Sequence, residues 1–102
     1  MRFASSLLVL PILLTACGGI ESESKDAVRS RLKDPDSAKF GKFTRVGDTR
    51  ACLTVNARNS MGGYTGDQVA FLWKKGDRWV VLQIEEVSHD NCITTSKSLG
   101  DK

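Results

Sequence analysis

The chain has 102 residues, with 15 basic and 12 acidic side chains and a formal net charge of +3 at neutral pH. This length accommodates one small domain. A charge excess this mild does not by itself indicate binding to nucleic acid, so no nucleic-acid partner is expected.

The amino terminus has the layout of a secretory signal peptide. Arg2 supplies the positive start, an apolar run follows at residues 7–14, and Thr15 and Ala16 are small residues suited to cleavage. The apolar run is too short to span a bilayer as a permanent helix. The predicted organisation is a signal peptide at 1–16, a lipidated anchor and polar tether at 17–23, a domain at 24–93 and a flexible tail at 94–102.

A cysteine directly follows the small residues. Leu14-Thr15-Ala16-Cys17 resembles the lipobox of bacterial lipoproteins. That resemblance implies cleavage before Cys17, a diacylglycerol thioether on its sulfur, and acylation of its new amino group with a fatty acid such as palmitate. Two or more acyl chains anchor a protein stably, at about 0.8 kcal/mol per buried methylene. In the alternative interpretation, Cys17 is an ordinary thiol of a secreted protein.

The residue after this cysteine bears on the destination. Lipoprotein sorting in enterobacteria resembles a rule in which aspartate after the cysteine retains the protein in the inner membrane. Gly18 stands at that position. The resemblance therefore implies the outer membrane, with the domain in the periplasm and the membrane contacted through the lipid on Cys17.

Two further cysteines remain, Cys52 and Cys92, which lie 40 residues apart. In an oxidising compartment an even pair predicts a disulfide, for which the chain-entropy model gives roughly 4 kcal/mol. Two free thiols or an intermolecular bridge are the alternatives. Only His89 could join the two sulfurs as a soft ligand, so neither a metal site nor a cofactor is expected.

Hydrophobic periodicity predicts one helix followed by four strands. The helix begins near Ser24 and ends before Pro35, with Val28 and Leu32 on one apolar stripe. After it, period-two alternation predicts strands in "KFGKFTRVG", "ACLTVNA", "DQVAFLWKK" and "RWVVLQIEEV". We therefore expect an α+β domain in which one N-terminal helix packs on a four-stranded antiparallel meander sheet.

The same alternation assigns side chains to the two faces of the sheet. In the second strand it places Leu53 on one face and Cys52 on the other. In the last strand, strict alternation places Ile84 on the face opposite to Trp79.

Two stretches, "LKDPDSAKF" at 32–40 and "CLTVNARNSMGGYTG" at 52–66, resemble a group of small uncharacterised bacterial and prophage envelope proteins. In that group the patterns LKDPDSAxF and CxxVNAxNSxGGYxG occur in this order. The resemblance covers about a quarter of the chain. The sequence departs from it at Leu53, where glycine is usual. The group brings no established activity, so it supports the architecture and leaves the function open.

The stretch "RNSMGGYTG" predicts a glycine-rich loop between the second and third strands. A phosphate-binding loop would need a helix behind the glycines, whereas a strand follows here, so a hairpin loop is favoured. Its length predicts that it projects from the sheet and serves in binding. Tyr64 would be either a packed anchor of the loop or an exposed contact. The candidate binding residues are Asn59, Ser60, Gly62, Gly63 and Tyr64.

Basic residues gather in the segment that includes the first two strands, where Asp48 is the sole acid. A solvated sheet edge explains such a segment, because lysines protect edges against aggregation. The functional interpretation is binding to an anionic envelope polymer, such as lipopolysaccharide or peptidoglycan, or to an acidic protein. The candidate residues of this basic patch are Lys39, Lys42, Arg45, Arg50 and Arg58.

No catalytic group is predicted. His89 lies in the polar carboxy-terminal segment and is expected to be solvated, and Glu85 and Glu86 point to opposite faces of a strand. The expected function is therefore non-enzymatic: a membrane-anchored lipoprotein with a small periplasmic interaction domain, in one version a prophage-encoded factor that excludes superinfecting phages. The alternative is an inhibitor of a cell-wall-cleaving enzyme of the lysozyme type, with the Gly-Gly-Tyr loop in its active site.

Overall fold

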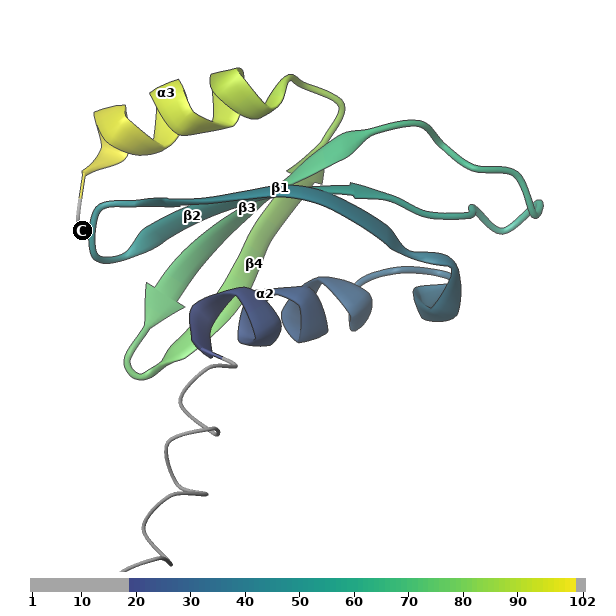
Figure 1. Cartoon of the computed structure of the whole chain (residues 1–102), viewed down its shortest axis with the longest axis horizontal. Coiled ribbons are helices and arrows are strands. Elements are labelled where there is room, and N and C mark those ends of the chain that lie inside the picture. Colours follow the sequence, from purple (N-terminus) through teal and green to yellow (C-terminus); the bar gives the residue numbers. More distant parts are fainter. Residues whose placement is uncertain (1–18, 101–102) are drawn as a thin grey trace, which may run out of the picture.

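The structure, a computed structural model, describes residues 19–100, in which two α-helices lie on opposite faces of one antiparallel sheet (Figure 1). The strands follow the order of the chain, β1-β2-β3-β4. The predicted α+β class and antiparallel meander are confirmed, whereas the second helix was not predicted. The elements are α2 (Gly19–Arg29), the 3-10 turn η2 (Pro35–Ser37), β1 (Lys39–Val46), β2 (Arg50–Asn56), β3 (Gln68–Lys75), β4 (Arg78–Glu85) and α3 (His89–Leu99).

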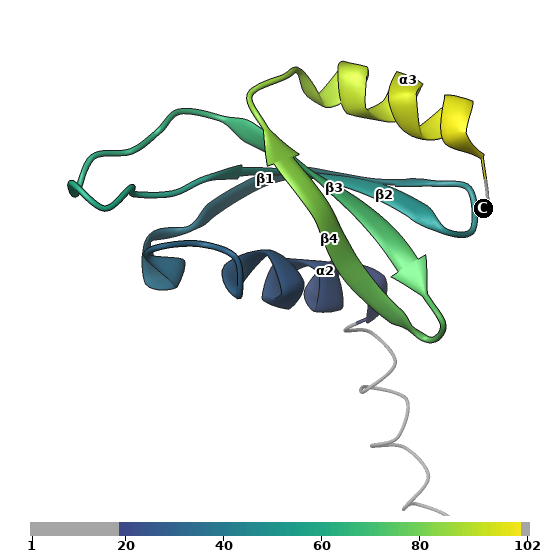
Figure 2. The ribbon, with the colours of Figure 1, turned by 180° about the vertical axis from the view of Figure 1, so that it is seen from behind.

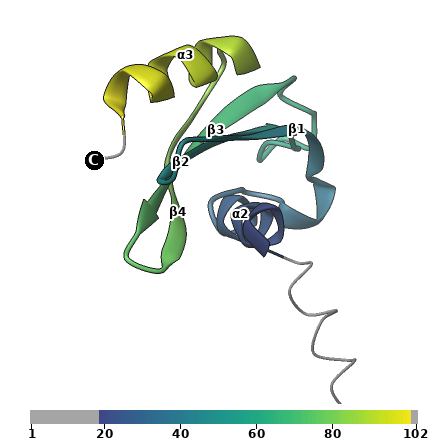
Figure 3. The ribbon, with the colours of Figure 1, turned by 60° about the vertical axis from the view of Figure 1, so that its left-hand side comes forward.

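Helix α2 covers the face of the sheet that holds the larger apolar cluster (Figure 3). Val28 of the helix has no exposed surface, and it packs with Leu53, Leu72 and Trp79 from three strands. Cys52 belongs to the second cluster, on the other side of the sheet. The predicted faces of β2 are therefore confirmed.

Helix α2 begins earlier than the sequence suggested. The predicted tether at 17–23 is wrong for the described part of it, because residues from Gly19 onward are helical. Tertiary contacts extend the helix: Glu23 Oε2 accepts a hydrogen bond of 2.9 Å from the backbone N–H of Trp79, and Ile20 packs against the core. Ser24 is consequently a buried residue within the helix rather than its cap.

Part of the predicted amino-terminal signal cannot be compared with this structure. The signal peptide at 1–16 and the lipidation site Cys17 lie outside the described residues. Neither helix between residues 19 and 100 combines the length and the apolar character needed to cross a membrane.

The last strand departs from strict alternation. Leu82 is an extra residue opposite the junction of Phe71 and Leu72, so the register between β3 and β4 shifts there. A β-bulge of this kind moves the following side chains to the other face. Ile84 therefore packs in the same cluster as Trp79, which corrects the predicted opposition, and Leu82 is 46% exposed.

Helix α3 replaces most of the flexible tail predicted at 94–102 and covers the second face of the sheet (Figure 2). Ser88 caps it, because its hydroxyl oxygen accepts a hydrogen bond of 3.0 Å from the N–H of Asn91. The buried residues of α3 are Cys92 and Ser96. The buried face of α3 is small and includes a polar serine, so its sequence has little hydrophobic periodicity. This explains why the helix was not predicted from the sequence.

Candidate functional site

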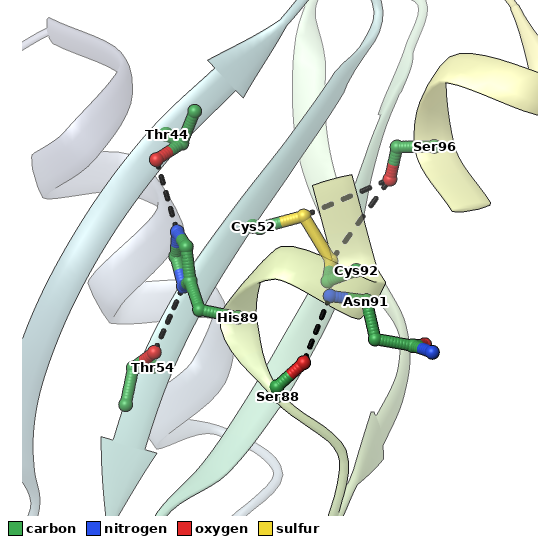
Figure 4. The surroundings of a disulfide bond; sticks show 8 residues. All are labelled: Thr44, Cys52, Thr54, Ser88, His89, Asn91, Cys92 and Ser96. Carbon is green, nitrogen blue, oxygen red and sulfur yellow. Dashed lines mark hydrogen bonds between the residues drawn. A yellow bond between two sulfur atoms is a disulfide. The ribbon is translucent and has the colours of Figure 1, made fainter. Parts of the chain in front are cut away.

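A disulfide joins Cys52 of β2 to Cys92 of α3, as predicted (Figure 4). The two Cα atoms lie 6.1 Å apart, within the range of ordinary disulfides, and neither cysteine is exposed. The hydroxyl of Ser96 lies 3.7 Å from the sulfur of Cys52 and donates to it, because disulfide sulfurs carry no hydrogen. The bond therefore fixes α3 to an inner strand of the sheet.

His89, expected to be solvated, instead lies partly buried at the start of α3 between two threonines (Figure 4). Its Nε2 is 2.9 Å from the hydroxyl of Thr44, and its Nδ1 is 2.8 Å from the hydroxyl of Thr54. In the neutral imidazole one nitrogen donates and the other accepts, so one threonine accepts and the other donates. Both ring nitrogens thus serve to hold α3 on β1 and β2.

The environment of His89 also lowers the pKa of its imidazole. Burial lowers the pKa of the imidazole below its usual value, the positive charge of Lys42 lowers it further, and Asp90 opposes these effects. Partial desolvation disfavours the charged form of a base. The neutral ring is therefore the form that this position favours.

The candidate binding loop projects beyond the sheet as a narrow hairpin between β2 and β3 (Figures 1 and 2). The N–H of Asn59 donates to the carbonyl of Gly63 over 2.8 Å, and the side-chain oxygen of Asn59 accepts from the N–H groups of Met61 and Gly63. Gly62 has a φ of +87°, a conformation that other residues rarely adopt. The loop thus has a shape fixed by its own hydrogen bonds.

The tip of this hairpin is open to solvent. Ser60, Gly62 and Gly63 are exposed, and Met61 between them is 91% exposed. Met61 was not among the predicted contact residues, although its place in a projecting loop was the available signal. An apolar side chain therefore occupies the most accessible part of the candidate loop.

Tyr64 lies at the base of the loop, where it is both anchored and partly exposed, and its role as a contact stays a prediction. It is 40% exposed, yet its hydroxyl donates to the carbonyl of Ser37 over 3.3 Å. Its ring centre lies 4.5 Å from the ammonium of Lys39 and 5.5 Å from the guanidinium of Arg58, within the range of cation–π contacts. We call Lys39, Arg58 and Tyr64 the tyrosine–cation cluster.

The two sequence motifs meet at Ser37. Its hydroxyl accepts a hydrogen bond of 2.9 Å from the N–H of Arg58 and donates one of 2.7 Å to the carbonyl of Asp34. Its carbonyl accepts the hydroxyl of Tyr64. The turn that Pro35 begins in "LKDPDSAKF" therefore supports the base of the loop in "CLTVNARNSMGGYTG".

The predicted basic patch is not one surface. Lys39 and Arg58 come together at Tyr64, whereas Arg50 is only 9% exposed and donates from Nε to the carbonyl of Gly100 over 3.3 Å. The other two members also have separate surroundings. Arg45 donates to the carbonyls of the β1–β2 turn, and Lys42 acts on His89 across the α3 side of the sheet.

Within residues 19–100, no three side chains of histidine, cysteine, aspartate or glutamate gather in a way that could hold a metal ion. The chain matches no model of a protein family, and no curated protein or solved structure is detectably similar to it.

Proposed function

We propose that this chain is a lipid-anchored protein of the bacterial envelope whose small domain binds another envelope component without catalysis. The observation that carries this proposal is the buried disulfide between Cys52 and Cys92. Such bonds persist in oxidising compartments and are rare in the cytosol of mesophiles. An exported domain agrees with the signal-like segment at 1–16 and with a lipidated Cys17, and Gly18 after that cysteine supports an outer-membrane, periplasm-facing location.

The projecting loop is the proposed contact surface. Its internal hydrogen bonds fix its shape before any partner arrives, which reduces the conformational entropy lost on binding. Lys39 and Arg58 at its base offer hydrogen-bond donors that suit carboxylate or phosphate groups. The partner is accordingly an acidic envelope protein or an anionic envelope polymer.

Exclusion of superinfecting phages is one specific version of this function, and it is supported by the resemblance of such short lipoproteins to superinfection-exclusion factors. Inhibition of a lysozyme-type enzyme is the second candidate, and one observation favours it: the narrow hairpin exposes Met61 at its tip, in a form suited to entering a cleft. The two candidates differ in their readout, because one changes phage plating and the other changes the rate of wall hydrolysis.

The anchor is tested by the variant Cys17→Ser in the full-length chain. Without the lipid, no described helix can hold the protein in a membrane, so the variant should move from the membrane fraction to the soluble fraction. Wild-type protein, washed with the same concentrated salt, is the control and should stay with the membrane. Retention of the variant after that wash would contradict lipidation at Cys17.

The contact surface is tested by Met61→Ala and Arg58→Glu at the loop, with Leu82→Ala as the matched control. Leu82 is also an exposed apolar residue but lies in β4, away from the loop. Both loop variants should weaken phage exclusion or enzyme inhibition by roughly tenfold, about 1.4 kcal/mol, which is typical of a residue at the centre of an interface. Equal activity of all three variants would exclude the loop as the contact.

A further inference from the structure

The two edges of the sheet are protected differently. On the edge strand β4, the N–H of Trp79 is bonded by the carboxylate of Glu23, and the carbonyl of Val81 accepts a hydrogen bond of 2.9 Å from Arg31. Side chains from α2 and the segment after it thus occupy backbone groups that could otherwise pair with another strand.

The opposite edge strand, β1, pairs only with β2 among the strands of residues 19–100. A bulge between Phe40 and Phe43 interrupts its register, so its regular part runs from residue 43 to 46. Unpaired backbone groups along an edge are a template for an added strand. This part of β1 is therefore the edge at which another chain can pair.

A groove of about 560 Å³ lies beside this part of β1 and is bounded on its other side by α3. Val46 and Ile93 give it apolar walls, and Ser96 and Gly100 lie along the helix side. Arg45 also lines it, although Arg45 packs towards Trp79 on the α2 side of the sheet. The groove therefore opens at the outer edge of β1 rather than under the sheet.

The charges around the groove indicate which kind of partner segment can bind there. The part of β1 near the groove carries Lys42 and Arg45 and no acidic residue, and the exposed Lys97 of α3 lines the groove. Two acidic residues lie near the groove in the chain: Asp48 directly follows the lining residue Gly47, and Asp90 lies three residues before Ile93. A second copy of β1 would bring two strands of positive net charge side by side, which disfavours pairing of two copies. An extended segment rich in carboxylates has the complementary charge.

We propose that the outer edge of β1 and the groove under α3 bind an extended acidic segment of a partner protein as an added strand. Backbone hydrogen bonds to residues 43–46 would give affinity, and side chains on one face of the added strand would enter the groove. Apolar side chains on the groove face would contact Val46 and Ile93, and the alternating glutamates or aspartates would be attracted by the positive charges of Lys97 and Arg45. The groove adjoins the β1–β2 turn, at the end of the domain opposite the projecting loop (Figure 1), so this surface is additional to the proposed function.

Two synthetic peptides of equal length test the proposal, one alternating valine with glutamate and one alternating valine with lysine. Each is added to the processed full-length protein in detergent, and amide signals and hydrogen exchange are followed by nuclear magnetic resonance. The glutamate peptide should perturb residues 43–47 and 93–100 and slow amide exchange in β1. The lysine peptide should bind at least about tenfold more weakly, because its charge repels the groove.

Substitutions at Lys97 then distinguish binding in this groove from nonspecific attraction of an acidic peptide to a positively charged protein. Lys97→Gln should weaken binding of the glutamate peptide by roughly threefold and Lys97→Glu by roughly tenfold. Lys75→Glu, at the end of β3, should leave the affinity for that peptide within about twofold. The proposal is overturned by absence of binding at millimolar peptide, by perturbation of residues 58–66 instead, or by equal effects of Lys97→Glu and Lys75→Glu. Concentration-dependent dimerisation that perturbs β1 without peptide would overturn it in favour of a second copy.

Discussion

Removal of the disulfide, through Cys52→Ala and Cys92→Ala together, should cost a large part of the stability of this domain. The cysteines are 40 residues apart, and the chain-entropy model gives about 4 kcal/mol for closing a loop of that length. Small domains are stable by only about 5–15 kcal/mol in total. We expect the doubly substituted protein to unfold at a markedly lower urea concentration than the oxidised wild type.

The loss should also have a local component at α3. An isolated helix of 11 residues is marginal in water, and apart from the disulfide α3 is held by the hydrogen bonds of His89 and the packing of Ile93. Hydrogen exchange should therefore become fast in α3 before the sheet unfolds. Thr95→Ala, on the exposed side of α3, is the control and should change the urea midpoint little. A stability loss under about 1 kcal/mol with α3 still protected would refute this account of the bond.

Three further substitutions have defined outcomes. Because the pKa of His89 lies below its ordinary value of 6.5, the unfolded chain takes up the proton more readily, so stability present above about pH 6.5 should fall as the pH decreases below it. In His89→Gln, the urea midpoint should no longer depend on pH in this range. An unchanged pH dependence would mean that other titrating groups cause it. Ser24→Ala should raise stability by about 1 kcal/mol in thermal unfolding, because the buried Ser24 hydroxyl has no hydrogen-bond partner among residues 19–100 and alanine favours helix; destabilisation would contradict this. Tyr64→Phe removes only the hydroxyl that reaches Ser37 and should cost about 0.5–1 kcal/mol, whereas an unchanged melting temperature would mean that this bond contributes nothing.

The sequence predicted those features that depend on local pattern. Alternation of apolar residues located the four strands, and the even pair Cys52 and Cys92 predicted the disulfide. Glycines between two alternating segments predicted the projecting loop. Each of these signals is contained in a short stretch of chain or in a count of one residue type.

Features that depend on contacts between distant segments were missed. Helix α3 buries only Cys92 and Ser96, so its stability comes from the disulfide and from His89 rather than from an apolar stripe. The environment of His89 depends on Thr44 and Thr54, which come together only when β1 pairs with β2. No local property of the segment around His89 indicates these partners.

In the candidate site, too, local features were predicted and contacts between distant segments were missed. The loop residues were identified from glycine content and length, but the support that Ser37 gives to Arg58 and Tyr64 crosses 21 and 27 positions of the chain. The order of the two motifs indicated a relationship between them without indicating contact. Similarly, the five basic residues are close in sequence, yet the fold distributes them over both faces and the base of the loop.

The early start of α2 limits how far the domain could travel from a membrane. If Cys17 carries the lipid, only Gly18 separates it from the first helical residue, Gly19. Two steps of extended chain reach about 7 Å, much less than the thickness of a small domain. The domain would then move in two dimensions along the lipid surface and could not search the depth of the periplasm. Its partner would have to be embedded in the same membrane or arrive at that surface.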